Sequence, residues 1–119
     1  RVSGAVTLKE ARTIAMNIVN SPLVKTAIHG GDPNWGRVMM AIGKEPQVKM
    51  NPDKIDLFFG NTHVFSNGKA LDYNCTKLKK HLQSKKILIQ VNLNLGEAST
   101  TAWGCDLTKE YVDINVAYS

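Results

Sequence analysis

The stretch Asp-Pro-Asn-Trp-Gly-Arg, residues 32–37, places an acid, an amide, a tryptophan and a guanidinium within six positions. Asp32 and Arg37 are close enough in sequence to form a local ion pair, and Asn34 is of a type that caps helices. Pro33 fixes one backbone torsion of a turn. The neighbouring glycines do not fit a Walker or dinucleotide-binding pattern. These residue types alone therefore favour a rigid, capped turn ahead of a helix over a phosphate site.

The other residue types that could carry catalysis are scattered. His29, His63 and His81 fall in different segments, and no two of them are spaced like metal ligands. None stands in a context that would activate a particular serine, threonine or cysteine. Cys75 and Cys105 are predicted to be buried free thiols in a reducing compartment. The residues by themselves therefore indicate neither a catalytic group nor a metal site.

Positive charge is concentrated in one short stretch. The chain of 119 residues has a formal net charge of +5, and much of it lies in KLKKHLQSKK, residues 77–86. A basic helix can bind nucleic acid, but no aromatic residue is interleaved here and no recognition motif appears. A solvated helix face is therefore favoured. The alternative, from a different functional class, is a stand-alone anion- or nucleic-acid-binding module.

The first half of the chain is predicted to be helical after one short strand at residues 1–5. TLKE, residues 7–10, forms a capping box that starts a helix with one apolar face. Asn20-Ser21-Pro22 ends or redirects this helix. The next stretch, residues 23–31, fits either a strand or a continued helix. WGRVMMAIG is predicted to form a further helix with its final glycine as the C-cap.

The second half is predicted to be rich in strands. Two apolar runs flank Gly60-Asn61, a two-residue hairpin signal, and a helix with an apolar inner side is expected at 74–83. Residues 87–95 alternate apolar and polar side chains, which predicts a strand with one buried and one polar face. A strand in STTAWGCDL, residues 99–107, is expected to pair antiparallel with it across the Gly96-Glu97 turn.

Together these elements predict a single α+β domain. The sheet is expected to be mixed or antiparallel, with helices packed on one face. A closing helix is expected to follow, with Thr108 as its N-cap. Apolar residues make up 43% of the chain and charged residues 21%, which is typical of a globular domain. No apolar run approaches the ~20 residues that a membrane-spanning helix needs.

Two long stretches carry a family resemblance. NSPLVKTAIHGGDPNWGRVMMAIG, residues 20–43, and LNLGEASTTAWGCDLTKEYVDINVAYS, residues 93–119, resemble the C-terminal half of the ornithine acetyltransferases, also known as glutamate N-acetyltransferases. The resemblance spans essentially the whole chain in the family's order. Asp-Pro-Asn-Trp-Gly-Arg and Trp-Gly-Cys-Asp-Leu-Thr are its most specific motifs. The resemblance implies a role in arginine biosynthesis.

The resemblance further implies ping-pong acetyl transfer. Family members are made as a precursor that cuts itself before a threonine, which becomes the nucleophile at the start of the β chain. This threonine takes acetyl from N-acetylornithine and passes it to glutamate; whether acetyl-CoA also serves as a donor stays open. An oxyanion hole on the α chain stabilises the tetrahedral intermediate, and no metal or organic cofactor is required. The α and β chains form an α2β2 assembly in the cytoplasm or, in a eukaryote, in the mitochondrial matrix.

On this resemblance, residues 1–119 are expected to be the C-terminal domain of a β chain whose nucleophile lies upstream of Arg1. Thr7, Thr13 and Thr26 are then ordinary helix-cap or helix-face positions, and no residue of this chain is expected to be catalytic. The chain alone is expected to be inactive. Its expected partners are the α chain and the rest of the β chain, with neither nucleic acid nor membrane among them.

Two substrate-binding residues follow from the resemblance. DINVAYS aligns the family's pocket asparagine with Asn115, whose amide can donate to a carboxylate and accept from an ammonium group. Ser119 is the candidate for the hydroxyl residue that the family has at its C-terminus. The loop at 32–37 is expected to rigidify the β chain beneath the pocket. An apolar docking patch is expected on the first helix and on Leu23–Ile28.

Overall fold

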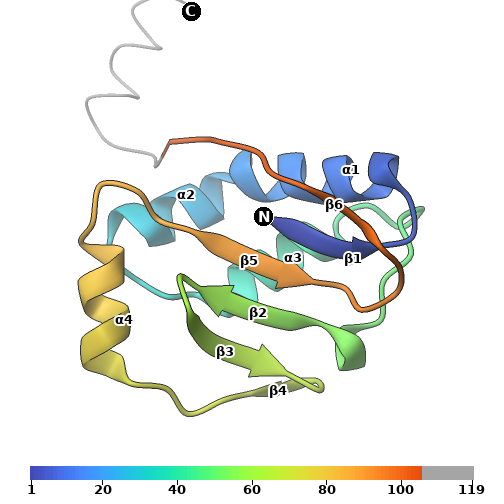
Figure 1. Ribbon diagram of the computed structural model, residues 1–119. Coiled ribbons are helices and arrows are strands. Elements are labelled where there is room, and N and C mark those ends of the chain that lie inside the picture. The colour runs from blue at the N-terminus through green and yellow to red at the C-terminus, as the bar shows by residue number, and fades with distance from the viewer. Residues whose placement is uncertain (106–119) are drawn as a thin grey trace, which may run out of the picture.

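The structure, a computed structural model, describes residues 1–105, and six strands within them form one mixed sheet (Figure 1). The sheet order is β4-β3-β2-β5-β1-β6, with β1 and β5 parallel and all other neighbours antiparallel. The strands are β1 (Val2–Ala5), β2 (Asp56–Phe59), β3 (Thr62–Ser66), β4 (Lys69–Ala70), β5 (Ile89–Asn92) and β6 (Ala98–Thr100). The predicted α+β class and mixed sheet are confirmed.

Four α-helices of the described chain complete the fold, together with a short 3₁₀ turn, η1 (Pro52–Lys54), before β2. The helices are α1 (Leu8–Val19), α2 (Pro22–His29), α3 (Trp35–Gly43) and α4 (Cys75–Leu82). The first three lie on one side of the sheet, and α4 stands at one end of it (Figure 1). The prediction of helices on one face of the sheet is therefore confirmed.

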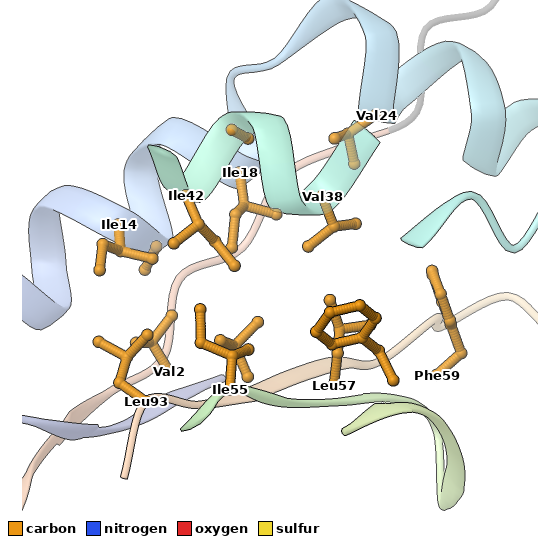
Figure 2. Packing of buried hydrophobic residues seen from close by; sticks show 14 of the residues in the cluster. Val2, Ile14, Ile18, Val24, Val38, Ile42, Ile55, Leu57, Phe59 and Leu93 are labelled. Atoms are coloured by element: carbon orange, nitrogen blue, oxygen red, sulfur yellow. The ribbon is translucent and has the colours of Figure 1, made fainter. Parts of the chain in front are cut away.

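The core fills the layer between the helices and the sheet. Val2, Val91 and Leu57 lie level with one another on β1, β5 and β2, and all three are fully buried. Figure 2 shows Val38 and Ile42 of α3 pointing into the same layer from the helix side. Burial of an aliphatic side chain contributes roughly 1.5–3 kcal/mol, so this layer is the main stabilising feature of the fold.

Side-chain caps explain where the helices begin. A hydroxyl or amide oxygen accepts the backbone N–H three residues later at each start, which satisfies a donor that the helix itself cannot. The caps are Thr7, Ser21, Asn34 and Asn74 for α1, α2, α3 and α4 respectively, with N···O distances of 3.1, 3.3, 3.0 and 3.1 Å. The stretch at 23–31, whose sequence fits either a strand or a helix, begins within helix α2. Ser21 caps this helix, and Pro22 follows in the first turn, where proline is favoured.

Two details of the helix ends differ from prediction. The capping box at α1 is half formed: Thr7 accepts from Glu10 N–H, but Glu10 Oε2 is buried without a hydrogen-bond partner among residues 1–105. Gly43 is the last residue of α3, and Lys44 is its C-cap in right-handed helical conformation. A glycine with a positive φ is therefore not needed at this end.

The predicted partner of the last strand was wrong. β6 pairs antiparallel with β1, not with β5. Strand β1 occupies the edge of β5, where the carbonyls of Arg1 and Ser3 accept from the N–H groups of Val91 and Leu93. The chain after β5 therefore crosses the end of β1, where Gly96 N–H donates to the Gly4 carbonyl, and β6 adds on the far side.

Candidate functional site

The Asp-Pro-Asn-Trp-Gly-Arg stretch is a structural connector between α2 and α3. Asp32 accepts from the Asn34 amide at 3.2 Å, and the Arg37 guanidinium donates to the Leu23 carbonyl at 2.9 Å. The Trp35 ring packs on Phe65 with centroids 5.0 Å apart. The predicted Asp32–Arg37 ion pair is not formed, because each side chain is engaged with a different partner. The predicted capped turn ahead of a helix is confirmed, because Asn34 caps α3 and these contacts hold the stretch against α2 and the sheet.

A polar cluster lies on the sheet face opposite α1, α2 and α3. Asp56 Oδ1 accepts from Ser66 Oγ at 2.6 Å and lies 3.0 Å from His63 Nε2, while Asp56 Oδ2 accepts from Asn94 Nδ2 at 2.9 Å. The His63 ring stacks on Phe58, with centroids 4.2 Å apart. The Asp56 side chain is 28% exposed, so these bonds form at the edge of solvent.

Hydrogen bonds favour the charged form of Asp56. Partial burial disfavours the carboxylate, but donation from Ser66, Asn94 and His63, with the charge of His63, outweighs it and lowers the pKa of Asp56. A serine nucleophile needs a base that accepts its own proton. Here the Ser66 hydroxyl donates its proton to Asp56 Oδ1, the same oxygen that His63 Nε2 contacts. The hydroxyl proton therefore does not point at His63. The cluster therefore orders the sheet surface and does not activate a nucleophile.

The sequence prediction missed this cluster. Asp56 and His63 lie in adjacent strands, but Asn94 comes 38 residues after Asp56 and reaches it from a positive φ of 55°. The register shift between Leu57 and Phe58 also brings Ser66 level with Asp56. β2 reads DLFF and β3 reads THVFS, so no regular alternation of polar and apolar residues marks Asp56, His63 and Ser66 as one group.

A cavity of about 700 Å³ opens at one end of the sheet; it is called the end cavity below. It lies between α1, α2, the loop that joins α4 to β5, and the segment Thr101–Cys105 after β6. Figure 1 shows these segments meeting at the same end of the fold. Apolar side chains from α1, α2 and the loop line it, together with Lys25, Lys85 and Lys86. This size and composition are those of a small-molecule site.

The two predicted substrate-binding residues, Asn115 and Ser119, lie outside the described residues, as does the expected helix capped by Thr108. The described chain ends at Cys105, which lines the end cavity. The roles of Asn115 and Ser119 therefore stay predictions.

The cysteine prediction was wrong, because both thiols are exposed. Cys75 is the first residue of α4, and Cys105 lies in the segment beyond β6. Within residues 1–105, no three His, Cys, Asp or Glu side chains come together in a group that could hold a metal ion. No helix in that same part of the chain has the length and apolar character that a bilayer crossing requires.

Comparison with known proteins identifies relatives over the whole chain. The model of the ArgJ family matches residues 1–119. The chain is 49% identical over 117 residues to the arginine biosynthesis bifunctional protein ArgJ of Bacillus cereus, and 44% identical over 119 residues to that of Dehalococcoides mccartyi. These matches cover 98% and 100% of this chain but 28% and 29% of the relatives, which are therefore much longer proteins.

The fold agrees with a solved structure of the same kind. The crystal structure of the arginine biosynthesis bifunctional protein argJ of Bacillus halodurans superposes with a TM-score of 0.90 at 39% sequence identity. The similarity covers 98% of this chain and 55% of the chain in that crystal. The family resemblance drawn from the sequence is thus confirmed by sequence and by fold, and the chain belongs to the ArgJ family.

Proposed function

We propose that this chain is the C-terminal part of the β chain of an enzyme that transfers acetyl from N-acetylornithine to glutamate. The observation that carries the proposal is 49% identity over 117 residues to a protein named for bifunctional arginine biosynthesis. A stand-alone anion- or nucleic-acid-binding module is the weaker reading, because it leaves this family membership unexplained.

The proposed reaction has two halves. A threonine hydroxyl outside this chain attacks the acetyl carbonyl of N-acetylornithine; the amide bond breaks, and ornithine leaves with the hydroxyl proton on its nitrogen. The amine of glutamate then attacks the acetyl ester, which forms N-acetylglutamate and returns the proton to the threonine. Oxyanion donors on the α chain stabilise both tetrahedral intermediates. No described residue of this chain is assigned a role in bond making or breaking.

The role proposed for this chain is substrate binding and support of the site. Asn115 is placed against the amino-acid portion of the substrate, where its amide can donate to the carboxylate and accept from the ammonium group. Ser119 contributes a hydroxyl beside it. The α chain and the rest of the β chain complete the enzyme as an α2β2 assembly, located in the cytoplasm or in the mitochondrial matrix of a eukaryote.

The test measures ornithine released by the full-length protein from N-acetylornithine, with and without glutamate. We expect release that depends on glutamate and parallel double-reciprocal lines, the pattern of a ping-pong reaction. A second arm supplies acetyl-CoA and glutamate and asks whether N-acetylglutamate forms. The 119-residue chain alone is expected to give no product. Absence of glutamate-dependent release by the full-length protein, or release by the isolated chain, contradicts the proposal.

A further inference from the structure

We propose that the end cavity binds a small anion that carries an apolar or aromatic body. The lining suits the apolar part of such a ligand. Val19 and Ile28 come from the ends of α1 and α2, and Leu88 comes from the loop before β5. A volume of about 700 Å³ falls within the range of roughly 300–1,000 Å³ typical of small-molecule sites.

Among residues 1–105, the charged side chains that line the end cavity are basic. Lys85 and Lys86 line it from the loop that joins α4 to β5. No aspartate or glutamate is present among its described lining residues. A cleft whose charged walls share one sign concentrates the opposite charge. A carboxylate or a phosphate ester is therefore the head group that the cavity favours.

A tryptophan stands at the rim. Trp103 lines the end cavity and is 85% exposed, an unusual exposure for so large an aromatic side chain. The neighbouring Gly104 lies tightly against α1, since a Cβ built there falls 3.0 Å from Val19 Cβ. This contact holds the segment at the cavity edge and leaves the indole available to stack on a flat apolar ligand.

Calorimetric titration of the full-length protein with matched probes tests the proposal. The anionic probes are 1-naphthaleneacetate and 1-naphthyl phosphate, which distinguish a carboxylate from a phosphate. The controls are neutral 1-naphthaleneacetamide, acetate and inorganic phosphate. We expect at least one naphthyl anion to bind saturably, roughly fivefold or more tighter than the neutral amide, and more weakly as salt is raised. Acetate and inorganic phosphate alone are expected to bind too weakly to saturate.

Two pairs of variants locate the binding. The double variant Lys85→Gln, Lys86→Gln is expected to bind the tighter of the two naphthyl anions about fivefold or more weakly. Lys69→Gln, on the distant β4, is expected to leave that affinity unchanged. Leu88→Ser is also expected to lower the affinity for this anion. Met40→Ser, which changes an exposed apolar residue on α3, is the control and is expected to leave the affinity unchanged. The Leu88 substitution keeps the backbone bonds of that residue to His81 and Gly60.

Three results would each overturn the proposal: no saturable binding of either naphthyl anion, equal binding of the neutral amide, or equal loss in the test and control variants. The naphthyl probes are not substrates of the proposed acetyl transfer. Failure here therefore leaves that proposal standing, and failure of the acetyl transfer leaves this one to be judged by its own titration.

Discussion

Replacing Asp56 with asparagine removes one negative charge from the polar cluster while nearly preserving its shape. In the native protein Asp56 receives three hydrogen bonds, from Ser66, His63 and Asn94. The Asn94 amide nitrogen also donates to the Lys54 carbonyl at 2.6 Å, so its position is fixed. If the amide nitrogen of the introduced asparagine faced Asn94 Nδ2, two hydrogen-bond donors would point at each other. The introduced side chain is therefore expected to turn its nitrogen toward Ser66 and His63, which can both present an acceptor.

The magnitude follows from this geometry. Three charge-assisted hydrogen bonds become neutral ones, and the difference is about 1 kcal/mol per bond when the site is fully buried. The Asp56 and His63 side chains are 28% and 36% exposed, so solvent screening reduces the effect. We expect a loss of about 1–2 kcal/mol in the free energy of unfolding at pH 7. The melting temperature should fall by roughly 5–10 °C.

The effect has a predicted pH dependence. The pKa of Asp56 is lower in the folded protein, so its stabilising contribution is present above the unfolded pKa of about 3.9 and is lost as the pH falls through the folded pKa. Urea unfolding of the native and Asp56→Asn chains at pH 7 and pH 3 measures this directly. We expect the difference between the two chains to shrink at pH 3. Asp72→Asn, at an exposed carboxylate, is the matched control and should change stability little.

The reasoning is refuted if Asp56→Asn matches the native chain within about 0.3 kcal/mol at pH 7, which is within the uncertainty of such measurements. It is also refuted if the difference stays the same at both pH values. In either case the three hydrogen bonds contribute nothing beyond what the neutral amide supplies.

Three further predictions concern packing, capping and substrate binding. Gly96→Ala should destabilise the chain by about 1–3 kcal/mol in urea unfolding, because the new Cβ would overlap the backbone carbonyl oxygen of Ala5. Gly36→Ala is the control: its Cβ would lie 3.4 Å from the nearest atom, Asn34 Oδ1, and the change should stabilise α3 by up to about 1 kcal/mol. Asn34→Ala should cost about 1 kcal/mol in the same assay, and an unchanged midpoint would show that the α3 cap is dispensable. In the full-length enzyme, Asn115→Ala should lower kcat/KM roughly ten- to a hundredfold with little change in melting temperature; a large melting change with normal kcat/KM would make Asn115 structural.

Local features of the fold were predictable from the sequence because neighbouring residues determine them. The Thr7 and Asn34 caps depend on contacts three residues apart, and both form. The Gly60-Asn61 turn joins β2 to β3 as predicted. A two-residue hairpin turn is determined largely by the two residues that form it. Periodicity also gave the buried face of α4, where Leu78 and Leu82 point inward.

Long-range features were not predictable in the same way. Alternation along 87–95 shows which side chains face the core, but it does not select the neighbouring strand. β1 takes the edge of β5 through pairs such as Val2 with Val91, nearly ninety positions apart, and so displaces β6 to the outside. The Asp56 cluster depends on this sheet and on one register shift. Cysteine burial failed as a prediction because the position of each cysteine, and not its residue type, decided its exposure.

The motif at 32–37 follows α2, the same helix that contributes residues to the end cavity. Arg37 reaches back to the Leu23 carbonyl in the first turn of α2, and Trp35 packs α3 onto Phe65 of the sheet. The later part of α2 carries Lys25 and Ile28, which line the cavity. The stretch 32–37 thus links three elements: Arg37 ties the start of α3 to the first turn of α2, and Trp35 packs α3 against the sheet. Fixing α2 at its start positions the residues that it contributes to the cavity.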